Sequence, residues 1–439
     1  MIPTLSLASP ADRARVDAFI ARLRLDPRDV ALNRGERAKM VAAVSDILAD
    51  VGERGDDALV DSARKFDDPN FSADQIRVSQ DEMRAARERV PADQLAAVRR
   101  SIAQVKEYQV GILPNPPAPI TRPGVELGLR FTPLDSAGLY FPGGKASYPS
   151  SLIMLAVPAQ VAGVKRIAVC TPPSKYGRSD LVLAACAELG LTDVFRAGGA
   201  AAIAALAFGT ATIPAVDKIV GPGNTYVQLA KRALAGCVGL DGFLGPSEIV
   251  TIADDTGNPA FIAADLIAQA EHDPGSCFLL TTSDKLAAAV SAELTRQTAL
   301  LDRRPAIEKS LASDSAIIVD PSLDVLIDYA NKFAAEHVNL QTADDKAVLN
   351  KLTHAGAVFV GQYSPIAAGD YIAGPSHCLP TNTTARFSSG ISVYEFLKRS
   401  SVARYDAQGL AADAPGIIAL AEAEHLSGHA ASVRVRGNP

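Results

Sequence analysis

From about residue 125 onward, short apolar segments alternate with longer segments of helical periodicity, and this alternation strongly constrains the fold. In the first half of the region the apolar segments are 138–141, 166–170, 194–196 and 218–220, and the helical patterns between them cover 150–162, 180–189 and 200–208. Short strands that alternate with helices predict a parallel sheet with right-handed crossovers, covered by helices on both faces.

The same alternation begins again after residue 247. Strands are expected at 249–253, 277–281, 316–320 and 357–360, and helices at 259–271, 283–296 and 323–335. The segments RIAVCTPPS near residue 170 and CFLLTTSDK near residue 280 are weakly alike, since each is an expected strand that turns through Thr and Ser into a helix. We therefore predict an α/β fold with two Rossmann-like parallel-sheet domains, at 125–246 and 247–385, consistent with duplication of one unit.

The segments on either side of these two domains are helical in pattern. Apolar residues recur at helical spacing over 37–66 and again over 81–110. The following segment, ILPNPPAPITRPGVE, contains five prolines in thirteen residues, which excludes a helix or a central strand and predicts a boundary near residue 124. We expect the N-terminal region, 1–124, to pack with the second α/β domain, and 386–439 to form a small helical C-terminal tail.

Composition and charge exclude several classes of protein. The net charge is −6, and no Lys/Arg run is interleaved with aromatic residues as a nucleic-acid binder would require. No run of 18 apolar residues is present, and the N-terminus lacks the pattern of a secretory signal, so we expect neither a membrane span nor secretion. The five cysteines are widely spaced and never form CxxC, which indicates free thiols in a cytoplasmic protein.

All six histidines follow residue 271, so any imidazole chemistry belongs to the second domain and the tail. In IAQAEHDPGS, Gln269 and His272 are three residues apart on one helix face, a spacing that allows two side chains to reach one ion. The alternative is a helix cap without a metal. Asp370 lies in a Gly- and Pro-rich segment, and His429 follows the tail helix. One amide, two imidazoles and one carboxylate would form a Zn²⁺ set if the fold brings them together.

Glu336 and His337 follow the helical segment YANKFAAEH. A carboxylate beside an imidazole can activate water and move protons, whereas the alternative is a solvated helix end where the helix dipole favours histidine. Ser247, in the string GPSE, could donate a hydrogen bond to a substrate or could cap a turn.

Three glycine-rich segments in the first domain lead from an expected strand towards a helix. They are FPGGKASYPSS at 141–151, RAGGAAAIAA at 196–205 and GPGNTYVQLAKR at 221–232. Unpaired N–H groups at such turns can hold a pyrophosphate, although none of the three matches GxGxxG. Three such turns in one domain favour a nucleotide-sized anionic ligand, and the alternative is three tight turns without a ligand.

Taken together, these strings resemble the histidinol dehydrogenase family from about residue 30 onward. The matching strings, in order, are GLYFPGG, GPGNTYV, GPSE, DLIAQAEHD, AAEHV, SPIAAGDYIAGPSHCLPT, ARFSSGISVYEF and EAEHLSGHA. The resemblance implies an enzyme of histidine biosynthesis that oxidises L-histidinol through the aldehyde to L-histidine, with two NAD⁺ consumed and one Zn²⁺ bound per active site.

The resemblance also implies a role for individual residues. The zinc ligands would be Gln269, His272, Asp370 and His429. Glu336 would activate the water that attacks the aldehyde, and His337 would be the base that takes the alcohol proton. The substrate would contact Ser247, His377 and Glu424 together with the zinc ligands and His337. NAD would lie along Tyr140, Ala201 and Asn224. The family forms homodimers in which the C-terminal tail reaches the neighbouring site, so Glu424 and His429 would act in trans.

The chain departs from residues that are common in the family at four positions. Ala201 lacks an amide that would touch the cofactor, Leu244 is bulkier than the usual Ala, His425 replaces a common Gly, and Ser376 replaces a frequent Asn. These changes leave open a related zinc- and NAD-dependent dehydrogenase that acts on another small alcohol or on a sulfonated diol. A sulfonate, however, favours Lys or Arg, which GPSH and EAEHLSGH lack.

Two further classes are weaker alternatives. A zinc hydrolase with Glu336 as its base would leave the three glycine-rich turns unexplained. A non-catalytic binding protein would leave the four expected metal ligands and the pair Glu336 and His337 unexplained.

Overall fold

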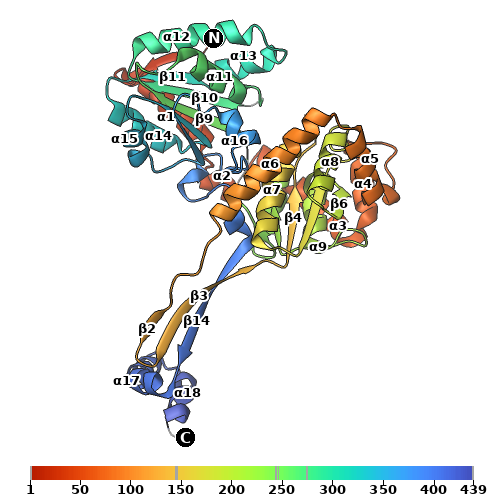
Figure 1. Cartoon of the computed structure of the whole chain (residues 1–439), viewed down its shortest axis with the longest axis vertical. Coiled ribbons are helices and arrows are strands. Elements are labelled where there is room, and N and C mark those ends of the chain that lie inside the picture. Colours follow the sequence, from red (N-terminus) through yellow and green to blue (C-terminus); the bar gives the residue numbers. More distant parts are fainter. Residues whose placement is uncertain (1, 144–146, 243–244, 246, 273–274, 438–439) are drawn as a thin grey trace.

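The computed structural model describes residues 2–437 except 144–146, 243–244, 246 and 273–274. Two α/β domains lie beside each other, and a long arm extends away from both (Figure 1). Each domain is built on a parallel sheet, so the predicted α/β fold with two Rossmann-like domains is confirmed.

The first domain has a five-stranded parallel sheet with the order β6-β5-β4-β7-β8. Its strands are β4 (Ser136–Tyr140), β5 (Arg166–Thr171), β6 (Asp193–Arg196), β7 (Lys218–Val220) and β8 (Gly239–Leu240). Its helices are α7 (Pro149–Ala162), α8 (Asp180–Glu188), α9 (Gly199–Phe208) and α10 (Thr225–Ala233). Helix α7 is apolar on nearly all sides because it packs between the sheet and another helix, and it ends where Gly163 adopts a left-handed conformation.

The second domain has a six-stranded parallel sheet with the order β1-β11-β10-β9-β12-β13. Its strands are β1 (Thr4–Ser6), β9 (Ser247–Ala253), β10 (Gly275–Thr281), β11 (Ala316–Val319), β12 (His337–Gln341) and β13 (Ala357–Val360). Its helices are α11 (Pro259–Ala270), α12 (Asp284–Thr298), α13 (Arg304–Ser313), α14 (Leu323–Phe333), α15 (Asp345–Lys351) and α16 (Ile366–Tyr371). Strands β1 and β12 were not expected from the sequence.

The two sheets share one topology. If the five strands of each domain are numbered along the chain, both sheets have the order 3-2-1-4-5, and β1 adds an edge strand to the second sheet. The two weakly similar sequence segments are β5 and β10, which hold the same second place in their domains. The strand order therefore agrees with two copies of one α/β unit.

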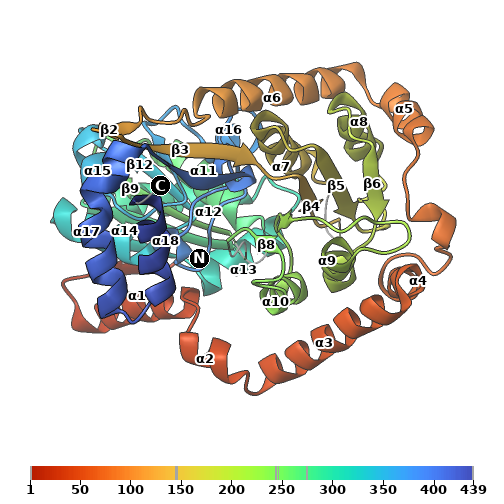
Figure 2. The same ribbon diagram turned by 90° about the horizontal axis from the view of Figure 1, so that it is seen from below.

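The N-terminal helices divide between the two domains, which corrects the expectation that they pack with the second one. They are α1 (Pro10–Leu23), α2 (Pro27–Leu32), α3 (Glu36–Arg54), α4 (Asp56–Phe66), α5 (Gln80–Arg89) and α6 (Ala92–Gly111), with a short 3-10 turn at Ala73–Gln75. Strand β1 and helix α1 join the second domain. Helix α3 packs on α9 and α10, whereas α5 and α6 cover α8 and α7 on the opposite side (Figure 2). These helices are needed there because they bury apolar faces of α7 and α9.

The arm is an antiparallel three-stranded sheet that carries the last two helices at its far end (Figure 1). Its strands are β2 (Ile120–Arg122), β3 (Val125–Pro133) and β14 (Leu397–Tyr405), and its helices are α17 (Ala407–Ala423) and α18 (Ser427–Gly437). Two short 3-10 turns, Thr384–Arg386 and Val393–Phe396, precede β14. The expected helical tail is therefore wrong for 397–405, because pairing with β3 over nine residues holds this segment extended. Residue 124 lies in the β2–β3 turn, where Gly124 has φ +71° and packs against Gly409.

Two further expectations bear on the class of protein. All five cysteines are free, as predicted, and four of them are buried. Among the described residues, no helix has both the length and the apolar character that a membrane span requires.

Candidate active site

A cavity of about 690 Å³ lies between the two α/β domains. The first domain contributes Pro142, which follows β4, and Pro222, which follows β7. These two strands are neighbours at the point where the strand order reverses, and ligands of open α/β sheets bind at the carboxyl ends of such strands. The second domain contributes the amino ends of its strands, with Ser247 at the start of β9 and His337 at the start of β12.

Ionisable side chains from the second domain gather in this cavity. The carboxylates are Glu271, Glu336 and Asp370, and the imidazoles are His272, His337 and His377. No Lys or Arg is among the described residues that line the cavity. The part of the cavity wall that the second domain forms is therefore suited to a cationic ligand or a metal ion.

Glu336 and His337 are buried, which corrects the alternative of a solvated helix end. Helix α14 ends at Phe333, and Ala334 takes a left-handed conformation that turns the chain into β12. Strand β12 lies between β9 and β13, so its first residue and the residue before it are covered, with 4% and 5% of their surface exposed. A buried ionisable pair is costly unless it is paired or used, which supports a chemical role.

The imidazole of His337 lies between two carboxylates, although neither of its nitrogens has a hydrogen-bond partner among the described residues. Its Nδ1 lies 3.5 Å from Oε2 of Glu336, and its Nε2 lies 3.6 Å from Oδ1 of Asp370. Burial alone would lower the pKa of His337, but the two carboxylates outweigh it and raise this pKa to about 10. Glu336 is fixed in turn, because its Oε2 accepts a hydrogen bond of 3.1 Å from the backbone N–H of Glu248.

Three of the four predicted zinc ligands lie on elements that meet at the cavity. Gln269 is in the last turn of α11, and His272 follows that helix, with its Nδ1 3.3 Å from the backbone oxygen of Gln269. Asp370 is in the short helix α16, within a segment that the sequence had indicated as a loop. Burial would raise the pKa of Asp370, but nearby histidines, including His337 and His272, lower it. These residues are thus close enough to interact electrostatically.

The donors present fit a zinc ion that needs one more ligand. Among the described residues, no group of three or more His, Cys, Asp or Glu side chains is arranged as a metal site. Of the predicted set, only two such side chains, His272 and Asp370, line the cavity, because Gln269 is an amide and His429 is on the arm. The Nε2 atom of Gln269 is buried without a hydrogen-bond partner. Turning the carboxamide over places an oxygen, a metal ligand, at the same position.

His377 and Ser247 also line the cavity, as predicted for residues that contact substrate. The ring of His377 is held at both nitrogens. Its Nδ1 lies 2.7 Å from the backbone oxygen of Asp370, and its Nε2 lies 3.0 Å from the hydroxyl of Ser151. This ring therefore joins the Asp370 segment to the start of α7 across the two domains.

Glu424 and His429 lie away from the cavity of their own chain. Both are exposed: Glu424 directly follows α17 and His429 is in α18, at the far end of the arm (Figure 1). His425 lies there too, with φ +58° at the junction between the two helices. Neither residue lines the two described cavities of its own chain.

Each of the three predicted cofactor residues has a structural role of its own. The hydroxyl of Tyr140 accepts a hydrogen bond of 3.1 Å from Gly199 N–H, and burial raises the pKa of this phenol. Asn224 is the N-cap of α10 and accepts from Val227 N–H at 3.1 Å. Ala201 is buried in the apolar cluster beneath the sheet.

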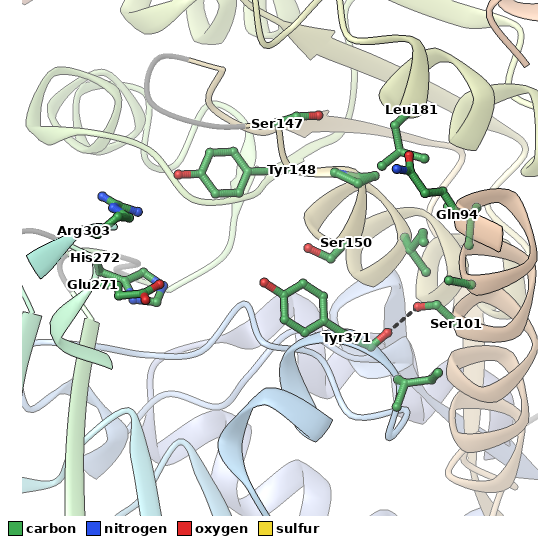
Figure 3. A pocket seen from close by; sticks show the side chains of 15 residues that line it. Gln94, Ser101, Ser147, Tyr148, Ser150, Leu181, Glu271, His272, Arg303 and Tyr371 are labelled. Carbon is green, nitrogen blue, oxygen red and sulfur yellow. Dashed lines mark hydrogen bonds between the residues drawn. The ribbon is translucent and has the colours of Figure 1, made fainter. Parts of the chain in front are cut away.

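A second cavity of about 500 Å³ adjoins the first (Figure 3). The two cavities share Tyr148, Ser150, Glu271, His272 and Tyr371. Its other walls include α6 and the first turns of α7 and α8. The hydroxyl of Ser101, on α6, donates a hydrogen bond of 2.6 Å to the backbone oxygen of Tyr371 and so fixes the end of α16. The cleft between the domains thus has an inner part with the ionisable cluster and an outer part with an apolar wall.

Sequence reasoning missed two buried carboxylates near the site. Glu248, in GPSE, has one oxygen that accepts from Asn382 N–H at 2.8 Å and one oxygen without a partner. Asp265 accepts from Ile366 N–H at 3.3 Å, at the start of the helix that carries Asp370. The only signal for Asp265 was its place four residues before Gln269, on the same helix face.

The departures noted in the sequence are only partly accounted for. Ser376 is buried, and its hydroxyl accepts from Cys378 N–H at 3.1 Å, so it shapes the segment that carries His377. Leu244 lies outside the described residues.

Two repeated parallel-sheet domains with a buried carboxylate–imidazole cluster between them define an α/β enzyme with an interdomain active site. The sequence model of the family "Histidinol dehydrogenase" matches residues 32–437. The chain belongs to the histidinol dehydrogenase family and is an oxidoreductase of histidine biosynthesis.

Individual relatives agree over nearly the whole length. A histidinol dehydrogenase of Geobacillus kaustophilus is 47% identical over 396 residues, which cover 90% of this chain and 93% of the relative. A histidinol dehydrogenase of Synechococcus sp. is 46% identical over 397 residues, with coverage of 90% and 92%. The crystal structure of histidinol dehydrogenase from Elizabethkingia anophelis is similar with a TM-score of 0.91 and 34% identity, covering 99% of this chain and 98% of that chain.

Proposed function

We propose that this chain catalyses the NAD-dependent, zinc-requiring, four-electron oxidation of L-histidinol through L-histidinal to L-histidine, as a cytoplasmic homodimer. The observation that carries the proposal is the cluster of three carboxylates and three imidazoles in the inner cavity. Membership of the histidinol dehydrogenase family supplies the reaction class.

The charge of the cavity favours an amino alcohol as the substrate. Histidinol carries a cationic amine beside its hydroxyl group, and the inner cavity presents Glu271, Glu336 and Asp370 without a described Lys or Arg in its wall. A sulfonated diol would place an anion against these carboxylates. Arg303 lines the outer cavity, where it is the only Lys or Arg among the described lining residues, and it is absent from the described lining of the inner cavity.

His337 and Glu336 are the residues that we assign to proton transfer. In the first oxidation a neutral His337 accepts the hydroxyl proton of the alcohol as hydride leaves the carbon that bears the hydroxyl group. Zinc bound to Asp370 would offset one of the two carboxylates that raise the pKa of His337, which leaves the ring able to act as a base. In the second, Glu336 accepts a proton from the water that adds to the aldehyde, and hydride leaves the resulting hydrate to give the acid. Both groups are buried, so the aldehyde is shielded from bulk water between the two steps.

Gln269, His272 and Asp370 would hold the zinc ion together with His429 of a second subunit. When bound, zinc supplies a positive charge that orients the substrate's nitrogen atoms, and NAD supplies the hydride acceptor. The buried, unpartnered amide of Gln269 and the lowered pKa of Asp370 support this assignment. Ser247 and His377 would contact the substrate from the cavity wall, and Glu424 of the second subunit would contact it from the arm.

The glycine-rich turns would hold NAD at the carboxyl edge of the first sheet. Tyr140, Ala201 and Asn224 all lie at this edge, at the end of β4 or in the first turn of a helix that follows a strand. Backbone N–H groups at helix N-termini can bind the pyrophosphate without a GxGxxG motif. Ala201 supplies no polar side chain, so contacts there would come from the backbone alone.

The arm supports the proposed dimer. Eight of the nine residues of β14 are exposed, and one of them is the apolar Val402. Ile120 and Leu420 are exposed too, and each of these three apolar residues has 46% or more of its surface exposed. A thin sheet exposed on both faces, with apolar side chains on it, is typical of an interaction surface. A second copy of this chain would cover it and would bring Glu424 and His429 to a neighbouring cavity.

NADH absorbance at 340 nm tests the substrate and the metal together. We expect absorbance to rise when L-histidinol and NAD are added, to stop rising after chelation, and to resume with added Zn²⁺. A sulfonated diol supplied in place of L-histidinol should give no signal. NADH from the diol alone, or undiminished activity in a chelated enzyme free of metal, would contradict the proposal.

A further inference from the structure

A buried ion pair lies directly beneath the turn that joins β7 to α10. It joins Lys231, on α10, to Asp241, which follows β8. The Lys231 Nζ atom is 2.6 Å from Oδ1 of Asp241, and the two side chains are only 4% and 0% exposed. Neither residue lines the described cavities. Because two charges are costly to remove from water, a pair this deep needs an explanation beyond stability.

The pair forms hydrogen bonds with both backbone groups of Gly221, the first residue of the turn. Lys231 Nζ donates a hydrogen bond of 2.5 Å to the backbone oxygen of Gly221, and Asp241 Oδ2 accepts one of 2.6 Å from the backbone N–H of Gly221. Charge-assisted hydrogen bonds to both groups fix the orientation of the peptide units on either side of this glycine.

Gly221 is itself pressed against the neighbouring strand. It has φ +123°, and a Cβ atom at this position would lie 1.8 Å from the backbone oxygen of Tyr140. The hydroxyl of Tyr140 accepts from Gly199 N–H in the next glycine-rich turn. The ion pair therefore fixes the turn at Gly221. This turn contacts Tyr140, whose hydroxyl group connects it to the second glycine-rich turn at Gly199. Pro222 and Gly223, which follow Gly221, line the inner cavity.

We infer that Lys231 and Asp241 are positioning residues that hold the Gly221–Asn224 turn in the conformation that binds the dinucleotide. The inference rests on the proposed use of NAD. The two residues act through the Gly221 backbone and touch neither the zinc ligands nor the pair of Glu336 and His337 in any described contact. Their loss should weaken dinucleotide binding while the metal site remains intact.

The decisive variant is Asp241→Asn, which keeps the shape of the side chain but removes its charge and leaves a single acceptor oxygen, so it cannot accept from both Gly221 N–H and Lys231 Nζ. Its matched control is Asp217→Asn. Asp217 lies at the other end of the same strands, where it accepts a hydrogen bond of 2.9 Å from Ser136 N–H at the amino ends of β4 and β7. NADH fluorescence titration of the full-length zinc-loaded protein gives the Kd directly. We expect Kd to rise at least about tenfold in Asp241→Asn, as for residues that orient a ligand-binding group, and to stay unchanged in the control.

A second variant covers the case in which Asp241→Asn does not fold. The double variant Lys231→Met with Asp241→Leu replaces the pair by apolar groups of similar volume, a change that buried ion pairs often tolerate. Its zinc content should stay near that of the wild type, while KM for NAD rises and kcat at saturating NAD is retained. A cooperative melting transition confirms that the variant folds, at a lower temperature because both backbone groups of Gly221 lose their partners. Unchanged Kd and KM in a folded variant would overturn the inference. Absence of NADH binding in the wild type would instead overturn the proposed use of NAD.

Discussion

At the scale of single residues, the site depends on His337 and on the two carboxylates on either side of its ring. Glu336 is fixed by a backbone N–H of β9, and Asp370 is placed by α16, so the imidazole is oriented by two different elements. The approach of Asp370 to this ring could not be predicted from the sequence, because Asp370 is 33 residues further along the chain. The adjacency of Glu336 and His337 was evident, but their burial was not.

Separate substrates distinguish the roles of the two proton-transfer residues. We expect His337→Asn to slow the oxidation of L-histidinol by about 10²–10⁴, the usual contribution of a positioned base. Glu336→Gln should slow mainly the oxidation of L-histidinal. Single-turnover NADH formation from each substrate measures the two steps, and equal losses on both substrates in both variants would contradict the separate assignments.

Glu248 gives a prediction about stability and pH. Burial raises the pKa of this carboxyl from 4.5 to about 8, so between these values the unfolded chain has lost the proton while the folded chain keeps it. The folded chain therefore loses stability as pH rises through this interval. The side chain of Glu248→Gln cannot ionise, so this variant should not lose stability over the interval. Its melting temperature should be similar to that of the wild type at pH 5 and higher at pH 9. The difference should be about 2–4 °C for each kcal/mol of unfolding free energy that the wild type loses. Parallel pH profiles for both proteins would contradict a raised pKa.

At the scale of elements, the sequence was informative wherever a strand is a local apolar run. Most strands of the two central sheets have that property, and these were expected within a few residues of their observed bounds. Strand β12 was missed because His337, Asn339 and Gln341 are polar, and β14 because it is exposed and gains its hydrogen bonds from β3, more than 260 residues earlier. Pairing between distant segments leaves no local pattern.

The arm gives the prediction at this scale. If Glu424 and His429 act in trans, the inactive variants His337→Asn and His429→Ala should complement each other when they are mixed and allowed to exchange subunits. Each mixed dimer then has one site in which every residue is native, and about a quarter of the wild-type activity should return. No recovery after verified exchange would show that the arm serves its own chain. His429→Ala alone should also lose bound zinc, measured by metal analysis.

At the scale of the whole molecule, function depends on two domains that face each other with opposite ends of their strands. The first offers the carboxyl ends of β4 and β7, and the second offers the amino ends of β9 and β12. The sequence allowed the fold class and the candidate residues to be predicted, the latter mainly through family resemblance. It could not predict their convergence, because that depends on how the domains pack. The position of His429 on an arm likewise follows only from the three-dimensional structure.

The central claim is that one site carries out both oxidations. The most direct measurement is the amount of NADH formed per L-histidinol when the zinc-loaded enzyme consumes a limiting amount of substrate in excess NAD. The proposed function predicts two NADH and one L-histidine per L-histidinol, without accumulation of free aldehyde. One NADH per L-histidinol, with L-histidinal as the product, would contradict it.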